Sequence, residues 1–223
     1  MNQELAKALK LYATRSHQEF SHYLLGNSKD TLIALFADLL TMYINDKNSS
    51  SIREFLTVTI AGFEHSEGKI GFNGFKQNSI IGGKPIYCEA KPQNIHSTDF
   101  HKQKNKKKLN GGGNFTDYTW ARFEKDKKEN PYLLTSGFVD GKLLYILSFP
   151  FQTPTFLLFL EEQLQKHFPN GDEKNKYLRS CRFNYKNYLQ DKSCRVIYLA
   201  ENEVLEHFKA FFDRKFYTQL IEK

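Results

Sequence analysis

The sequence has no long apolar run and few cysteines, and each absence excludes a class of protein. No stretch approaches the roughly 18 to 20 consecutive apolar residues that span a bilayer, and the polar start MNQELAKALK lacks the apolar segment of a signal peptide. We therefore expect a cytoplasmic protein with no membrane partner. The three cysteines, Cys88, Cys181 and Cys194, include no Cys-x-x-Cys pair. They predict buried free thiols rather than disulfides or a structural zinc site.

What is present is typical of a folded globular chain with a basic surplus. Hydrophobic residues make up 40% and charged residues 26% of the 223 residues, which fits a single domain (1–223) with a sizeable core. We find no internal repeat. The net charge of +7 favours a polyanionic partner such as nucleic acid without establishing one.

The residues up to about 65 predict a helical N-terminal portion. Apolar residues recur at helical spacing in two segments, the second of which Ser28 can cap and the stretch 45–51 can end. A third helix is expected from Ser51 to about Phe63. Its apolar stripe would leave Glu54 to one side.

From about residue 66 the pattern changes to strands mixed with helices. The strongest local signal is Asp140-Gly141 between two apolar runs, which predicts a β-hairpin. The lysine-rich stretch 93–114 reads as a long mobile loop, with Gly111 to Gly113 as a hinge. We expect an α/β fold in an α+β arrangement, with a central mixed sheet flanked by helices. The other predicted elements are strands at 76–81, 85–91 and 195–200 and helices at 115–128, 155–167 and 203–221.

One predicted strand carries the residues with the clearest chemistry. Because side chains alternate along a strand, Glu89 and Lys91 share one face while Cys88 and Ala90 share the other. A carboxylate can hold a divalent cation against a phosphate oxygen, and an ammonium group beside it can orient an attacking water. That pairing suits phosphodiester hydrolysis. A solvated ion pair on an exposed strand is the alternative.

In this region the chain resembles the PD-(D/E)XK nuclease superfamily, and within it the type II restriction endonucleases. The resemblance covers Glu54, Asn73-Gly74 and Glu89-Ala90-Lys91, in the order helix, strand, strand. It implies a restriction-endonuclease-like fold and Mg²⁺-dependent, site-specific cleavage of double-stranded DNA by a homodimer in a restriction-modification system. Glu89 would be the metal-binding acid and Lys91 the lysine of the motif.

The chain departs from the family at residue 73, where the family has an aspartate and this sequence has Asn73. Either Asn73 ligates through its amide oxygen, or Glu54, Glu64 or Glu67 supplies the missing charge, since hard cations prefer anionic oxygen ligands. Two other interpretations remain open. Glu54 can be a surface acid, and Asn73-Gly74 can be only a turn.

Basic and amide side chains after the strand are the candidates for DNA contacts. Lysines on a loop can meet phosphates, and amides can pair with adenine. The DNA-binding candidates are Gln93, Asn94, Lys102, Lys104, Lys106, Lys107, Lys108 and Arg122, with Arg179 and Arg182 as further arginines. The lysine run can equally be a solvated loop. Two other functions fit the sequence: a DNA-binding protein that does not cut, and a basic module that binds an acidic protein or membrane.

Overall fold

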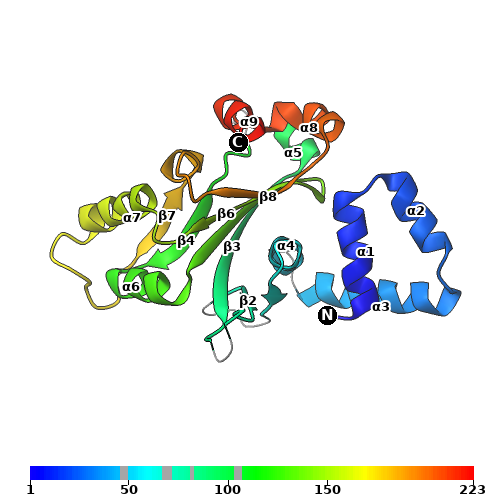
Figure 1. The fold of residues 1–223 in the computed structure, drawn as a ribbon, viewed down its shortest axis with the longest axis horizontal. Helices are drawn as coiled ribbons and strands as arrows, with labels where there is room; N and C mark the ends of the chain where they lie inside the picture. Colours follow the sequence, from blue (N-terminus) through cyan, green and yellow to red (C-terminus); the bar gives the residue numbers. More distant parts are fainter. Residues whose placement is uncertain (46–49, 67–71, 81–82, 103–106) are drawn as a thin grey trace.

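The structure is a computed structural model that describes residues 1–45, 50–66, 72–80, 83–102 and 107–223. In this part of the chain six strands form a mixed sheet in the order β1-β2-β3-β5-β6-β8, and helices flank it (Figure 1). The expected α/β class with a central mixed sheet is therefore confirmed. The strands are β1 (Glu64–His65), β2 (Gly74–Lys76), β3 (Ile86–Ile95), β5 (Tyr132–Val139), β6 (Lys142–Pro150) and β8 (Arg195–Leu199).

A second, two-stranded sheet and the helices complete the fold. The small sheet pairs β4 (Gly113–Tyr118) with β7 (Leu178–Phe183). The helices α1 to α3 gather at one end of the molecule, and α6 and α7 lie at the other with the small sheet (Figure 1). The helices are α1 (Gln3–Thr14), α2 (His17–Leu25), α3 (Lys29–Asn45), α4 (Ser50–Ile60), α5 (Ser97–Lys102), α6 (Trp120–Glu129), α7 (Pro154–His167), α8 (Asn202–Phe208) and α9 (Arg214–Ile221).

The hairpin β5–β6 is the best-predicted element of the sheet. Asp140 and Gly141 both have positive φ, 48° and 81°, as a two-residue turn between right-twisted strands requires. Val139 pairs with Lys142 across it. Both strands are buried along nearly their whole length, so they form the centre of the sheet. β3 runs parallel to β5 and antiparallel to β2.

Local capping residues explain where several helices begin. Ser16 and Glu19 form a capping box, which starts α2, a helix that the apolar spacing did not predict. Ser28 caps α3 as expected, because its Oγ accepts a hydrogen bond from the backbone N–H of Thr31 at 3.1 Å. Thr119 caps α6, so the helix expected at 115–128 starts later, at Trp120. Asp213 caps α9 and thereby divides the single helix expected over 203–221.

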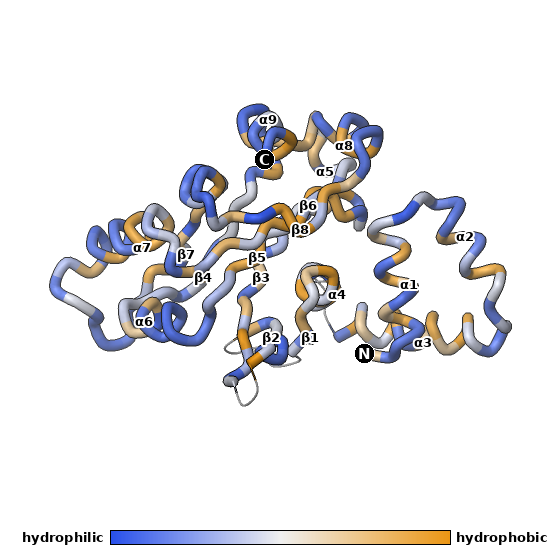
Figure 2. Tube along the Cα trace, in the orientation of Figure 1, coloured by the Kyte–Doolittle hydropathy of each residue, from blue (hydrophilic) through white to orange (hydrophobic). Residues whose placement is uncertain are grey.

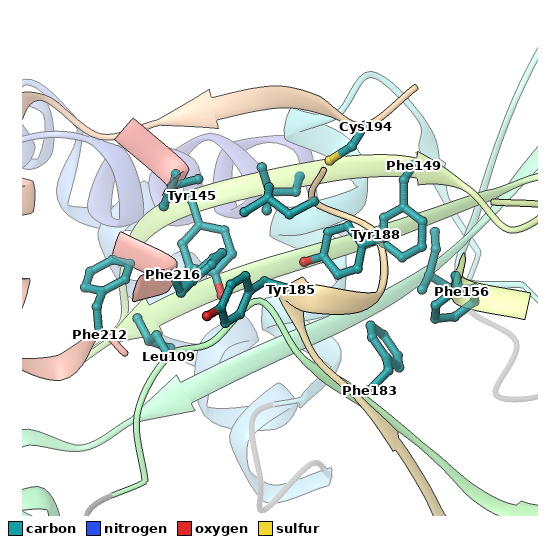
Figure 3. Close-up of a cluster of buried hydrophobic side chains, with 14 of the residues drawn as sticks. Leu109, Tyr145, Phe149, Phe156, Phe183, Tyr185, Tyr188, Cys194, Phe212 and Phe216 are labelled. Carbon is teal, nitrogen blue, oxygen red and sulfur yellow. The ribbon is translucent and has the colours of Figure 1, made fainter. Parts of the chain in front are cut away.

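The core is rich in aromatic rings (Figure 3). Tyr188 stacks on Phe149 with ring centroids 3.9 Å apart, and its buried hydroxyl lies 2.8 Å from Oγ1 of Thr135 and donates to the carbonyl oxygen of Gly111 at 2.6 Å. The glycine triplet that begins at Gly111 is therefore fixed against the core. All three cysteines are free and buried, as predicted, and burial raises the pKa of Cys194 to about 11.

In the stretch 93–114, the described residues 93–102 and 107–114 do not form the continuous long loop that the composition predicts. β3 continues to Ile95, α5 follows, and β4 begins at Gly113. The glycines are needed for close packing rather than as a hinge: a Cβ on Gly113 would lie 2.8 Å from the Cβ of Lys91 and 2.6 Å from the ring of Phe183. The strand expected at 76–81 is also wrong in its bounds, since β2 ends at Lys76.

The N-terminal helices pack less tightly than the sheet. Lys142 at the start of β6 donates to the backbone carbonyl oxygens of Tyr12 and Arg15, and thereby holds the end of α1. On α3 only Leu35 is buried, although the helix carries several large apolar residues. Figure 2 shows these apolar stretches of α3 away from the central sheet. Among the described residues, no helix combines the length and apolar character needed to cross a bilayer.

Candidate functional site

The predicted pair lies side by side on β3. Nζ of Lys91 is 2.5 Å from Oε1 of Glu89, and the two side chains are 16% and 12% exposed. The opposite face of the strand, with Cys88 and Ala90, is buried together with Val58 of α4. The alternation expected from the sequence is therefore present. The two side chains are also mostly shielded, which distinguishes the pair from a solvated surface ion pair.

Asn73 links this pair to α4. Its Oδ1 accepts a hydrogen bond from the backbone N–H of Ala90 at 2.7 Å, and its Nδ2 donates to Oε2 of Glu54 at 3.2 Å. The backbone N–H of Asn73 also donates to the carbonyl oxygen of Cys88 at 2.9 Å. Asn73 therefore extends the β2–β3 pairing with its side chain and brings the Glu54 carboxylate toward the centre of β3. It is more than a turn residue.

Close packing of β2 against α4 and β3 requires a glycine at position 74. A Cβ at this position would lie 2.3 Å from Cγ1 of Val58 and 3.1 Å from Sγ of Cys88. The Asn-Gly sequence thus allows β2 to approach both α4 and β3 closely, and this close approach is what places Glu54, Asn73 and Glu89 in one region.

Glu64, another candidate acid, does not join this region. Glu64 is exposed on β1 and pairs with Phe75 of β2, so it lies roughly 10 Å across the sheet from β3. Glu67 lies outside the described residues. The structure therefore favours Glu54, and not Glu64, as the acid nearest Asn73.

The donor chemistry fits a hydrated magnesium ion better than a fully protein-ligated one. Within the described ranges no group of three or more His, Cys, Asp or Glu residues could hold a metal. Mg²⁺ does not require such a group, because it usually keeps several waters and binds through one or two carboxylates and the substrate phosphate. Glu89 would be the principal ligand here. Glu54 and the side-chain oxygen Oδ1 of Asn73 would bind the ion's waters or ligate the ion directly.

A further acid near the pair, Asp126 on α6, was missed by the sequence analysis. Asp126 is only 7% exposed, and burial raises the pKa of its carboxyl group. The nearby charge of Glu89 raises this pKa further, while Arg122 and Lys91 lower it. The sequence holds a signal for it: Asp126 lies three residues after the buried Phe123, on the inward face of a short helix.

Arg122 has a different role from the predicted DNA contact. Its Nη1 donates to the carbonyl oxygen of Thr116 at 2.8 Å, and its Nε lies 3.8 Å from Oδ2 of Asp126. The guanidinium group thus joins β4 to α6 and offsets the charge of the buried acid. These contacts assign Arg122 to the support of the fold.

A polar cleft of about 1120 Å³ starts on β3 directly after Lys91. Glu89 and Lys91 do not line it, but Gly113, which packs against Lys91, does. Among the described residues that line it, every charged side chain is basic. The lining includes Arg53, Pro92, Gln93, Asn94, His96, Lys107, Lys108, Asn110, Asn114, Arg182 and Asn184.

The predicted DNA contacts differ in where they lie relative to the cleft. Asn94, Lys107 and Lys108 do line the cleft. Lys102 is exposed on α5 outside the cleft lining, and Lys104 and Lys106 lie outside the described residues. Gln93 also lines the cleft, but its side-chain amide is hydrogen-bonded to other residues of the protein.

The bonds of Gln93 fix the glycine segment. Its Oε1 accepts from the backbone N–H groups of Asn110 (3.1 Å) and Gly112 (3.2 Å) and from the hydroxyl of Tyr145 (3.3 Å). Its Nε2 donates to Oδ1 of Asn110 at 2.8 Å. We therefore correct the prediction for Gln93: it positions the 110–113 segment beside β3, and reading a base would break these internal bonds.

Comparison with known proteins assigns no family to this geometry. No protein-family model matches the chain, and no curated protein matches it. The resemblance to PD-(D/E)XK nucleases thus rests on Glu54, Asn73, Glu89 and Lys91 and on the order of the elements that carry them, α4, β2 and β3.

Proposed function

We propose that the chain is a Mg²⁺-dependent, site-specific endonuclease for double-stranded DNA, with its chemistry at Glu89 and Lys91. The observation that carries the proposal is their position on β3: a shielded acid and amine 2.5 Å apart, followed at once by a cleft whose charged lining is basic. Cleavage of a phosphodiester backbone uses both features. The acid and the amine act at the scissile phosphate, and the basic residues of the cleft bind the neighbouring phosphates.

The chain's own residues supply positioning and charge. A bound magnesium ion would polarise the phosphate and lower the pKa of a coordinated water. Glu89 would hold that ion beside the phosphate, and the ammonium group of Lys91 orients the attacking water and offsets the developing negative charge. Asn73 fixes the backbone between them through Ala90. Attack with departure of the 3′ oxygen leaves 5′-phosphate and 3′-hydroxyl ends.

The cleft supplies salt-sensitive affinity. Arg53, Lys107, Lys108 and Arg182 border it, and each cation that neutralises a phosphate releases counterions from the duplex. Binding should therefore weaken steeply as salt concentration rises.

The proposal includes a homodimer formed through α3. Six of its large apolar side chains are 38% to 67% exposed: Ile33, Phe36, Leu39, Leu40, Tyr43 and Ile44. At about 200 Å² for each fully exposed side chain they offer on the order of 600 Å², most of the about 800 Å² that each partner contributes to a stable interface. The charged residues of α3 are Lys29, Asp30 and Asp38, so the helix suits neither DNA nor an anionic membrane. A second copy of the chain supplies an equally apolar surface.

The experiment that tests the function is digestion of a phage or plasmid genome with Mg²⁺. Discrete bands that disappear when the metal is chelated support a site-specific nuclease. A smear supports nonspecific cutting, and DNA that stays intact over a range of substrates and salt concentrations contradicts the proposal.

Asn73 favours a second candidate function, a DNA-binding protein that does not cut. The residue offers a neutral oxygen where the family has an anionic one, and that oxygen already accepts the N–H of Ala90. Salt-dependent binding to duplex DNA that stays intact in Mg²⁺ would select this function.

A further inference from the structure

The small sheet β4–β7 has one buried and one polar face. Phe115, Cys181 and Phe183 are buried in the aromatic core. The alternate residues, Asn114, Thr116, Ser180 and Arg182, form the other face, on which Thr116 and Arg182 are exposed. Asn114 pairs with Arg182 across the sheet, and Thr116 pairs with Ser180. The result is a two-stranded ribbon that presents a row of polar side chains.

Hydrogen bonds fix the members of this row. Oγ of Ser180 donates to Oδ1 of Asn114 at 2.7 Å and accepts from Nε of Arg182 at 3.0 Å. The backbone of Arg182 is also held by Gln163 of α7, which accepts from its N–H at 3.2 Å and donates to its carbonyl oxygen at 3.1 Å. Arg182 and Asn114 are therefore oriented before any ligand binds, which reduces the entropy lost on binding.

The row lies on the basic cleft and next to the candidate catalytic pair. Asn114 and Arg182 both line the cleft. Gly113, the residue before Asn114, packs against Lys91 so closely that a Cβ would lie 2.8 Å from that of the lysine. The polar face of the ribbon and the Glu89–Lys91 pair are thus joined through a single residue of β4.

The free groups of the row are hydrogen-bond donors. Nε of Arg182 is engaged by Ser180, while its Nη1 and Nη2 have no hydrogen-bond partner among the described residues. In Asn114 it is Oδ1 that is engaged, so in the same part of the chain Nδ2 remains to donate. Guanine offers two acceptors, O6 and N7, on its major-groove edge, and an arginine that donates to both is the commonest specific contact with DNA.

We propose that the β4–β7 ribbon enters the major groove and reads guanine, with Arg182 donating to O6 and N7 and Asn114 donating to an acceptor on a neighbouring base. A two-stranded ribbon has the width that the major groove admits. This inference rests on the proposed function, because it takes the ligand of the cleft to be duplex DNA. To the proposed function it adds the β4–β7 ribbon as the element that reads the DNA sequence and guanine as the base that this ribbon selects.

The test is selection of binding sites from a pool of random duplexes, with Ca²⁺ in place of Mg²⁺. The wild-type chain is expected to enrich duplexes with a guanine at a fixed position. Replacing that guanine by 7-deazaguanine, which lacks N7, should weaken wild-type binding roughly tenfold to hundredfold. Arg182→Lys keeps the charge but loses the rigid planar fork that matches O6 and N7, so it should bind the unmodified site more weakly than the wild type and lose less affinity when 7-deazaguanine is introduced.

Arg179→Lys is the matched control. Arg179 is on the same strand but pairs with Asp117 at 3.3 Å and does not line the cleft, so this variant should select the same sites as the wild type. Equal thermal midpoints for both variants would show that β7 still folds.

The outcomes separate this inference from the proposed function. If the wild-type chain binds no duplex, both fail. If it binds duplexes without selectivity, the reading role of the ribbon and the site specificity of the proposed function are both overturned. If the wild type selects a guanine and Arg182→Lys and Asn114→Ala select it as strongly, only the reading role of the ribbon is overturned.

Discussion

Asn73 accepts the backbone N–H of Ala90 at 2.7 Å, at the one residue that separates Glu89 from Lys91. Its amide nitrogen at the same time donates to Glu54. An aspartate would preserve the first bond but not the second, because it cannot donate. An amide at this position therefore bonds both Glu54 and the backbone of β3, whereas an aspartate would add a second negative charge beside Glu54.

Asn73→Asp is expected to lower the Mg²⁺ concentration needed for half-maximal cleavage, since a hard cation gains an anionic ligand. Without metal the variant should be less stable by about 1 kcal/mol, because two carboxylates would meet where a hydrogen bond stood. Metal titrations of cleavage and urea unfolding measure the two effects. Asn78→Asp is the control, because the half-buried Asn78 accepts the backbone N–H of Ile80 through Oδ1, a bond that an aspartate preserves. An unchanged Mg²⁺ requirement would argue against Asn73 as part of the metal site.

Asp126→Asn is expected to make stability less dependent on pH. Burial raises the pKa of Asp126 in the folded chain, so the folded state holds this proton more tightly than the unfolded state. The wild-type chain therefore loses stability as pH rises from the ordinary carboxyl pKa through the raised one. Relative to the wild type, the variant should gain stability over this range. Urea unfolding of both chains at pH 4 and pH 7 tests this prediction. An equal difference in unfolding free energy between variant and wild type at the two pH values would contradict it.

Gly113→Ala is expected to destabilise the fold by about 1 to 3 kcal/mol, because the added methyl group would overlap Lys91 and the ring of Phe183. Cleavage should fall as well, since Lys91 must move. Gly26→Ala is a matched control, because its Cβ would meet the nearest atom at an ordinary 3.5 Å. Equal unfolding midpoints for the two variants would show that Gly113 does not pack closely against Lys91 and Phe183.

Phe36→Lys is expected to convert a dimer to a monomer, because it places a charge in the apolar face of α3, where Phe36 is 67% exposed. Sedimentation velocity should give a species near twice 26.1 kDa for the wild-type chain and a single-chain species for the variant. Ile80→Lys changes another exposed apolar residue, 70% exposed, and should leave the mass unchanged. A monomeric wild-type chain at micromolar concentration would refute the α3 interface.

The sequence predicted the local features of the site well. Alternation alone placed Glu89 and Lys91 on one face of β3, and the positive-φ preference of Asp140-Gly141 predicted the hairpin that forms the centre of the sheet. Both signals act between residues close in sequence, so neither needs knowledge of the fold.

The features that depend on distant contacts were not predicted. The paired residues of β4 and β7 are 60 to 70 positions apart in the sequence, and Asn114 and Arg182 are neighbours only because of that pairing. Gln93 looked like a DNA contact because nothing in sequence shows that the 110–113 segment folds back onto it. The apolar spacing of α3 predicted the helix but could not show that most of its stripe stays exposed.

The proposed roles of Glu89 and Lys91 are tested most directly by the cleavage rates of three variants on one DNA substrate in Mg²⁺. Glu89→Gln and Lys91→Met should each reduce the rate by at least a hundredfold while duplex binding stays within a few-fold, since both keep the shape of the strand. Glu64→Gln, an equally conservative change on β1, should cut like the wild type. Full cleavage activity in the first two variants would place the reaction elsewhere in the chain.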